Sequence, residues 1–214
     1  MTDRASTMQA VLGGRVVPVV VLDDLETAVP VASALADGGL PVAEITFRTA
    51  AAAAAIGRIA AETDALVGAG TVVRPEQVDE AVDAGARFVV TPGLSVRVIE
   101  RCRELEVPVI PGVATATEVI AAVHQGLDLL KLFPAEAAGG TTLLRALRGP
   151  FPDVRFVPTG GISAANAAAY LALPSVAAVG GSWMVTPELI AARDFARITH
   201  LAREAVSIAA GVAR

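Results

Sequence analysis

Short apolar runs and alanine-rich stretches alternate along almost the whole of this 214-residue chain. The apolar runs have the length of strands and the alanine-rich stretches that of helices, and glycine or proline separates most of them. The expected strands are residues 15–21, 42–46, 65–69, 88–91, 108–110, 128–133, 154–158 and 176–180. The expected helices are residues 25–36, 50–62, 75–84, 95–105, 115–125, 141–147, 163–171 and about 187–210.

Eight strand–helix units in one short chain predict an α/β fold of the single-domain (β/α)8 TIM barrel type. A chain of 214 residues can build one sizeable core but is short for two ordinary domains. We therefore expect one domain over residues 1–214, with a short N-terminal extension at residues 1–12. An open doubly wound sheet is the alternative, although such a sheet normally has fewer strands in this length.

Residues at the predicted helix ends support these boundaries. Serine and threonine are favourable N-caps, proline fits a first helical turn, and glycine ends helices. The expected N-caps are Ser95, Thr115 and Ser163, the first-turn proline is Pro75, and the terminating glycines are Gly85 and Gly126. The acidic pair Asp23–Asp24 is expected to begin a helix.

Composition restricts the possible function and location. The net charge of −5 without a basic cluster argues against nucleic-acid binding. The strongly apolar runs, such as residues 16–22, are too short to span a bilayer, so no membrane association is expected. The lone Cys102 and an N-terminus without a signal-like segment predict a cytoplasmic protein. Two histidines offer little material for a metal site, and we expect neither a metal nor a cofactor.

The second expected strand ends in polar residues. Strand alternation directs Glu44, Thr46 and Arg48 to one side and Ile45 and Phe47 to the other. Helices cover the outside of a barrel, so the polar side is expected to face inward. Glu44 could then move protons, and Arg48 could hold a carboxylate through two hydrogen bonds. A purely structural Glu–Arg pair at the mouth of the barrel is the alternative.

Lys131 lies in an expected strand among apolar neighbours, between Leu130 and Leu132. An amine among such neighbours is removed from water, which disfavours its charged form, and a neutral amine attacks ketones. Phe133 follows on the same face and could form a wall of the site. The alternative is a lysine at a strand end that extends its ammonium group into solvent.

Two glycine turns follow the last two expected strands. The first is Thr159-Gly160-Gly161-Ile162-Ser163 and the second is Gly180-Gly181-Ser182. Barrels often bind phosphate at the loops after the seventh and eighth strands, where glycine lets the backbone approach the ligand closely. The pair of turns therefore predicts a phosphorylated ligand.

Over residues 13–205 the chain resembles the bacterial 2-keto-3-deoxy-6-phosphogluconate (KDPG) aldolases, which share a family with the 4-hydroxy-2-oxoglutarate (KHG) aldolases. Two long stretches and four short ones carry this resemblance. The long stretches are GLPVAEITFR at 39–48 and GLDLLKLFPAE at 126–136. The short stretches are VGAGT at 67–71, TPG at 91–93, PTGGIS at 158–163 and GGSW at 180–183.

The resemblance implies a role for each site residue. Lys131 would form the Schiff base and Glu44 would transfer protons. Arg48 and Thr71 would bind the carboxylate of pyruvate, and Pro92, Phe133 and Thr159 would line the pocket. The phosphate would lie at the two glycine turns, at Gly160, Gly161, Gly181 and Ser182. The family also implies a homotrimer.

The implied reaction is the cleavage of KDPG to pyruvate and glyceraldehyde 3-phosphate, without a metal. Two alternatives within the same chemistry are an aldolase for KHG and one for 2-keto-3-deoxy-6-phosphogalactonate. From a different class, a non-catalytic sugar-phosphate binding barrel would keep the fold without the reaction.

Overall fold

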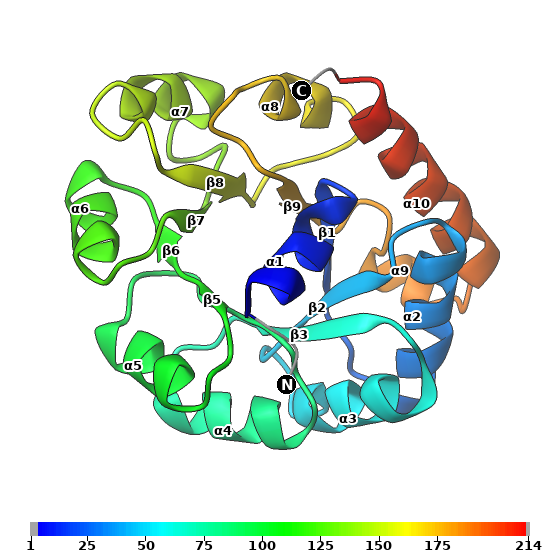
Figure 1. Cartoon of the computed structure of the whole chain (residues 1–214). Helices are drawn as coiled ribbons and strands as arrows, with labels where there is room; N and C mark the ends of the chain where they lie inside the picture. The colour runs from blue at the N-terminus through cyan, green and yellow to red at the C-terminus, as the bar shows by residue number, and fades with distance from the viewer. Residues whose placement is uncertain (1–3, 213–214) are drawn as a thin grey trace.

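The computed structural model describes residues 4–212 and has an α/β fold in which helices surround parallel strands (Figure 1). The strands are β1 (Val16–Val20), β2 (Val42–Thr46), β3 (Leu66–Gly70), β4 (Val89–Val90), β5 (Val109–Ile110), β6 (Gly112–Val113), β7 (Leu129–Leu132), β8 (Arg155–Pro158) and β9 (Val179–Gly181). The helices are α1 (Arg4–Gly13), the 3-10 turn η1 (Leu25–Thr27), α2 (Ala28–Asp37), α3 (Ala52–Glu62), α4 (Pro75–Asp83), α5 (Val96–Glu104), α6 (Ala116–His124), α7 (Gly140–Arg148), α8 (Ala167–Leu171), α9 (Pro187–Ala191) and α10 (Phe195–Ala210).

The strands form a curled parallel sheet of six members, in the order β5-β4-β3-β2-β1-β9, and a second sheet of three, β6-β7-β8. The first and last strands of the chain are neighbours, because β1 pairs with both β2 and β9. An isolated bridge between Thr159 and Gly180 links the ends of β8 and β9. On the other side, β5 and β6 are separated by Pro111 alone, and its carbonyl accepts a hydrogen bond from the Lys131 amide at 2.8 Å.

A small apolar cluster fills the space enclosed by the strands. Its buried members are Val11, Val17, Val42, Phe88, Val90, Ile110, Leu129, Val157 and Ala178. Most strands contribute one residue, whereas Val11 comes from α1, which crosses the centre of the ring of strands in Figure 1. The helix therefore covers the interior with its own apolar side chains, Met8 and Leu12 included.

A much larger apolar cluster packs between the strands and the surrounding helices. Alternation along the strands separates the two clusters: Leu129 belongs to the interior one, whereas Leu130 and Leu132 belong to the outer one. In α3 the outer cluster receives Ala52, Ala55, Ile56 and Ile59, the spacing of one helical face. No helix in the described part of the chain is long and apolar enough to cross a membrane.

Most predicted elements are confirmed, but several differ in extent. Residues 187–210 form two helices, and the extension at residues 1–12 holds α1 from Arg4 onward. The fifth strand continues beyond Pro111 as β6, because proline has no N–H to give to the ladder and interrupts it. The helix predicted over residues 163–171 is α8, which begins only at Ala167. The cap expected at Ser163 is therefore wrong. There the Ser163 amide donates to Asn166 Oδ1 at 2.8 Å, which forms a turn before the helix.

The other predicted helix ends are present. Ser95 accepts a hydrogen bond from the Val98 amide, and Thr115 accepts one from the Glu118 amide. Pro75 is in the first turn of α4. Gly85 and Gly126 have left-handed backbones, with φ of 100° and 73°.

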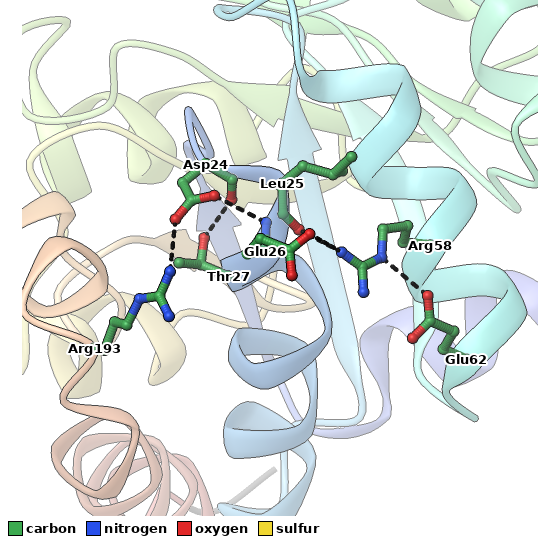
Figure 2. Close-up of polar contacts among 7 residues, drawn as sticks. All are labelled: Asp24, Leu25, Glu26, Thr27, Arg58, Glu62 and Arg193. Atoms are coloured by element: carbon green, nitrogen blue, oxygen red, sulfur yellow. Dashed lines mark hydrogen bonds and ion pairs between the residues drawn. The ribbon is translucent and has the colours of Figure 1, made fainter.

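Asp24 begins the short turn η1, as expected of the acidic pair (Figure 2). Its carboxylate accepts a hydrogen bond from the Glu26 amide at 3.0 Å and pairs with Arg193 at 3.1 Å. Arg58 on α3 joins the same surface network by pairing with Glu26 and Glu62, both at 2.9 Å. This network ties α3 and the α9–α10 connection to the segment that follows β1.

Candidate active site

Two charged side chains meet inside the ring of strands. Lys131 projects from β7 and Glu44 from β2, and the Lys131 Nζ is 3.1 Å from the Glu44 Oε1. Only 5% of Lys131 and 3% of Glu44 is exposed. β2 and β7 belong to different sheets, so this contact crosses the interior. The sequence predicts the inward orientation of Glu44 and the removal of Lys131 from water, and the structure brings the two groups together.

Alternation along the strands explains why these residues face inward. On β7, Leu129 and Lys131 point to the interior while Leu130 and Leu132 pack against the outer helices. On β2, Val42 is in the interior cluster and Ala43 and Ile45 are in the outer one. Glu44 therefore lies one layer above Val42, toward the carboxyl end of the strand. Lysine does not reach solvent here, so the alternative of an extended surface lysine is wrong.

Glycines leave the room that these side chains need. A Cβ on Gly70, at the end of β3, would be 2.3 Å from the Glu44 Oε1, so any larger residue would displace the carboxylate. A Cβ on Gly180 would likewise be 2.3 Å from the Thr159 Oγ1. The sequence shows both glycines as strand-end turns, but only the structure shows that they accommodate inward side chains.

Phe133 lies beside the pair, and Thr159 lies just past the end of β8, the strand that pairs with β7. The Phe133 ring centroid is 5.5 Å from the Lys131 Nζ, within the range of a cation–π contact. Thr159 follows β8 and is 6% exposed, and its hydroxyl donates to the Val157 carbonyl at 3.4 Å. The Phe133 ring therefore lies next to the amine, whereas the described contacts of the Thr159 hydroxyl do not include Lys131 or Glu44.

Arg48 is not where strand alternation predicts it. β2 ends at Thr46, and Phe47 and Arg48 lie in the following turn, so the alternation no longer applies. Arg48 is exposed and lines a surface cavity of about 260 Å³ together with Arg74 and Glu80. Thr46 does face inward, where its hydroxyl donates to the Val20 carbonyl at 3.1 Å. The alternative of a structural Glu44–Arg48 pair finds no support among the described contacts, in which Glu44 pairs with Lys131.

Thr71 and Pro92 follow the next two strands. Thr71 comes directly after β3, is half-buried and has φ of 58°, a left-handed backbone that is unusual for a β-branched residue. Such strain is concentrated at functional sites. Pro92 is half-buried after β4, and its carbonyl would be 2.4 Å from a Cβ on Gly112. Thr91, which the sequence did not single out, holds this turn by donating to the Gly93 carbonyl and accepting from the Gly112 amide.

The two glycine turns lie at adjacent strand ends. Gly160 and Gly161 follow β8 with φ of 98° and 80°, a conformation that L-residues rarely adopt. Gly181 is buried at the end of β9, and the exposed Ser182 follows it. The bridge between Thr159 and Gly180 brings the two turns next to each other, as a shared phosphate site requires.

Other reactive groups do not take part in this arrangement. Cys102 is fully buried on α5, where burial raises the pKa of its thiol to about 12. His124 is an exposed residue at the end of α6. Within residues 4–212, no group of three histidine, cysteine or acidic residues could hold a metal ion.

The buried pair is the chemically distinctive feature. Removing two charges from water costs several kcal/mol per ion, which an ion pair recovers only with good geometry. A proton transfer from Lys131 to Glu44 would leave a neutral amine and a carboxylic acid, the first a nucleophile and the second a proton donor. A parallel α/β fold with such a lysine near its strand ends defines an enzyme of the class that attacks carbonyl groups with an amine.

Comparison with known proteins gives the family. The family model described as "KDPG and KHG aldolase" matches residues 8–201, so the chain belongs to this aldolase family. The chain is 51% identical over 194 residues to the KHG/KDPG aldolase of Escherichia coli K12, and the match covers 90% of this chain and 91% of the relative.

Solved structures agree with the family and the fold. The KDPG aldolase of Zymomonas mobilis ZM4 with 3-phosphoglycerate has a TM-score of 0.90 at 42% identity, covering 100% of both chains. The KDPG aldolase of Legionella pneumophila, with pyruvate captured as a covalent carbinolamine intermediate, has a TM-score of 0.89 at 43% identity. That likeness covers 92% of this chain and 96% of the other.

Proposed function

We propose that this chain is a class I aldolase that cleaves KDPG to pyruvate and glyceraldehyde 3-phosphate through a Schiff base on Lys131. The observation that carries the proposal is the buried contact of 3.1 Å between the Lys131 Nζ and the Glu44 Oε1. The similar E. coli enzyme is named for KHG and KDPG, and the Legionella enzyme was captured with pyruvate bound covalently, which supports a 2-keto acid substrate.

The reaction follows from the chemistry of the two groups. Neutral Lys131 attacks the C2 ketone to give a carbinolamine, and loss of water gives an iminium. Its positive nitrogen accepts the electrons of the C3–C4 bond when Glu44, directly or through water, removes the proton of the C4 hydroxyl. Glyceraldehyde 3-phosphate leaves, C3 of the enamine takes up a proton, and water hydrolyses the iminium to release pyruvate and the free lysine.

The remaining residues would bind and orient the substrate. Arg48 and Thr71 are proposed to hold the keto acid carboxylate, which requires the exposed Arg48 side chain to turn toward the interior when substrate binds. Pro92, Phe133 and Thr159 would line the pocket. The substrate phosphate would bind at the glycine turns, to backbone N–H groups of Gly160, Gly161 and Gly181 and to the Ser182 hydroxyl. Fixing both ends of the substrate places C2 against the amine.

We also propose that the two sheets are parts of one closed (β/α)8 barrel, a single domain over residues 1–214. The bridge from Thr159 to Gly180 and the short step at Pro111 support closure at both junctions.

The family resemblance and the exposed Val73, Val96, Ile120 and Val123 support a homotrimer. Light scattering would then give about three times the chain mass of 21.7 kDa. A reduced, buried Cys102 is compatible with the proposed cytoplasmic location.

The substrate is tested by comparing cleavage rates. We expect kcat/KM for KDPG to exceed that for the phosphogalactonate epimer and for the unphosphorylated KHG, because the glycine turns favour a phosphate. A higher value for KHG or for the epimer would assign the chain to that reaction instead. Full activity of Lys131→Met would overturn the Schiff-base mechanism, and no activity on any of the three aldols would favour a non-catalytic binding barrel.

A further inference from the structure

The glycine turn after β8 needs support from its neighbours, because Gly160 and Gly161 have no side chains of their own. Both residues have left-handed backbones, and hydrogen bonds from neighbouring residues engage the carbonyl groups of the turn. Successive N–H groups in such a turn can form a concave site for an anion. Hydrogen bonds that fix the carbonyl groups of this turn therefore also fix the direction of its N–H groups.

One support is the segment that follows β7, the strand of Lys131. The Ala135 amide donates to the Thr159 carbonyl at 2.8 Å, and the Glu136 amide donates to the Gly160 carbonyl at 3.1 Å. The stem of Glu136 fills the space beside Gly161, where a Cβ would be 2.5 Å from the Glu136 Cγ. Glu136 thus contacts both glycines of the turn.

A hydrogen bond from another element fixes the carboxylate of Glu136. The buried hydroxyl of Tyr170, on α8, donates a hydrogen bond to the Glu136 Oε1. Burial and this bond both raise the pKa of Tyr170, so its hydroxyl remains a donor throughout the physiological range. Gly140, the first residue of α7, faces the pair, since a Cβ there would be 3.0 Å from the Tyr170 oxygen and 3.3 Å from the Glu136 Oε1.

Charge makes this orientation important. A carboxylate next to a phosphate site repels the ligand, whereas a carboxylate directed at the N-terminal end of a helix is stabilised by the helix dipole. Tyr170 keeps the Glu136 carboxylate beside the first turn of α7. On the other side of the turn, Asn166 donates from Nδ2 to the Gly161 carbonyl at 2.9 Å.

We propose that Glu136 and Tyr170 are positioning residues that hold the Gly160–Gly161 turn in its phosphate-binding form and so set the preference for phosphorylated aldols. The inference rests on the proposed function, because it assigns a substrate phosphate to this turn. Neither residue is placed in contact with the reacting carbons. Their effect is therefore confined to the phosphate end of the substrate.

The test compares two substrates on Tyr170→Phe and Glu136→Ala. For each variant we expect the ratio of kcat/KM for KDPG over KHG to fall by about tenfold, the loss expected when a charge-assisted hydrogen bond that fixes a loop is removed. The fall should be mainly in KM for KDPG, with KM for KHG unchanged. Glu136→Gln, which still accepts a hydrogen bond, should restore most of the preference. Glu104→Ala, at an exposed residue paired with Arg101, is the matched control.

Equal losses on both substrates, or an unchanged ratio in both variants, would overturn the inference. If Tyr170→Phe fails to fold, the comparison of Glu136→Ala with Glu136→Gln still tests the inference. Glu136 is exposed, so both of these variants should fold. Borohydride trapping of pyruvate on Lys131 separates this outcome from failure of the proposed function. Trapping should be equal in wild type and variants, and its absence from wild type would contradict the proposed function itself.

Discussion

The contact between Lys131 and Glu44 depends on residues that have no functional group. Glu44 reaches across the interior because Gly70, on the neighbouring strand, has no side chain in its path. The same holds for Thr159 and Gly180. The geometry of the site therefore depends on the glycines at positions 70 and 180 as well as on the lysine and the carboxylate.

Gly70→Ala tests this dependence at a single residue. Its new Cβ would overlap the Glu44 carboxylate and displace it, so kcat/KM should fall by about 10²-fold or more, the contribution typical of a general acid–base group. Steady-state kinetics with a pyruvate-release assay measures the loss. Gly57→Ala is the matched control, because a Cβ there meets nothing closer than the Ala84 carbonyl at 3.8 Å. Unchanged activity of Gly70→Ala would show that Glu44 is not held in this position.

The residue types and alternation along the strands predict part of this site. Glu44 faces inward as alternation predicts, Lys131 is buried as its apolar neighbours predict, and Phe133 lies beside Lys131 as their shared face predicts. Arg48 does not, because a strand end cannot be read from alternation and β2 ends two residues before it. The hydrogen bond between Tyr170 and Glu136 could not be predicted, because 34 residues separate the two side chains and only the fold brings them together.

At the level of elements, α6 begins with a complete capping box. The Glu118 carboxylate accepts hydrogen bonds from the amides of Ala114 at 2.8 Å and Thr115 at 2.9 Å, while Thr115 accepts one from the Glu118 amide. Four donors at a helix start have no partner within the helix, and the box satisfies part of this requirement. The helix directly precedes β7, so the box stabilises the start of the unit that presents Lys131.

Thr115→Ala should lower the free energy of unfolding by about 1 kcal/mol, the usual cost of losing a threonine N-cap. Urea denaturation measures it, with the exposed Thr117→Ala of the same helix as the control. An equal loss in both variants would indicate an effect of side-chain truncation rather than of capping.

Acid should weaken the same capping box. Hydrogen bonds from the Ala114 amide and then from Thr115 lower the pKa of Glu118, so the folded state binds the Glu118 proton less readily than the unfolded state. The contribution of Glu118 is then present above its unfolded pKa of about 4.3 and is lost as pH falls through the lower folded pKa. The stability difference between wild type and Glu118→Ala should therefore shrink between pH 7 and pH 3. A difference independent of pH would contradict this assignment.

Element types were more predictable from sequence than element boundaries. Thr115 and Ser95 cap helices because each is followed by an uninterrupted apolar helical face. Ser163 follows two glycines with left-handed backbones, and the chain needs the extra turn through Asn166 before α8 can begin. The predicted strand at residues 108–110 ends before Pro111, whereas the structure continues beyond it as β6, and the interruption between β5 and β6 has the local reason that Pro111 lacks an N–H.

For the molecule as a whole, α1 joins the N-terminus to the interior of the ring. The sequence treats residues 1–12 as an extension, yet Val11 is fully buried in the interior cluster. Val11→Ala removes two buried carbon atoms and leaves a cavity, so we expect a loss of about 2 kcal/mol in unfolding free energy with KM unchanged. The exposed Gln9→Ala is the control. A loss below that of the control would show that α1 does not stabilise the ring.

The central claim is that Lys131 is the amine that forms the Schiff base, and reductive trapping tests it most directly. The enzyme is incubated with pyruvate and sodium borohydride, digested and analysed by mass spectrometry. We predict that the peptide containing Lys131 gains the mass of reduced pyruvate, that activity is lost in proportion, and that Lys131→Met gains no mass. An unmodified Lys131 in enzyme that still cleaves KDPG, or an adduct on another residue, would contradict the account.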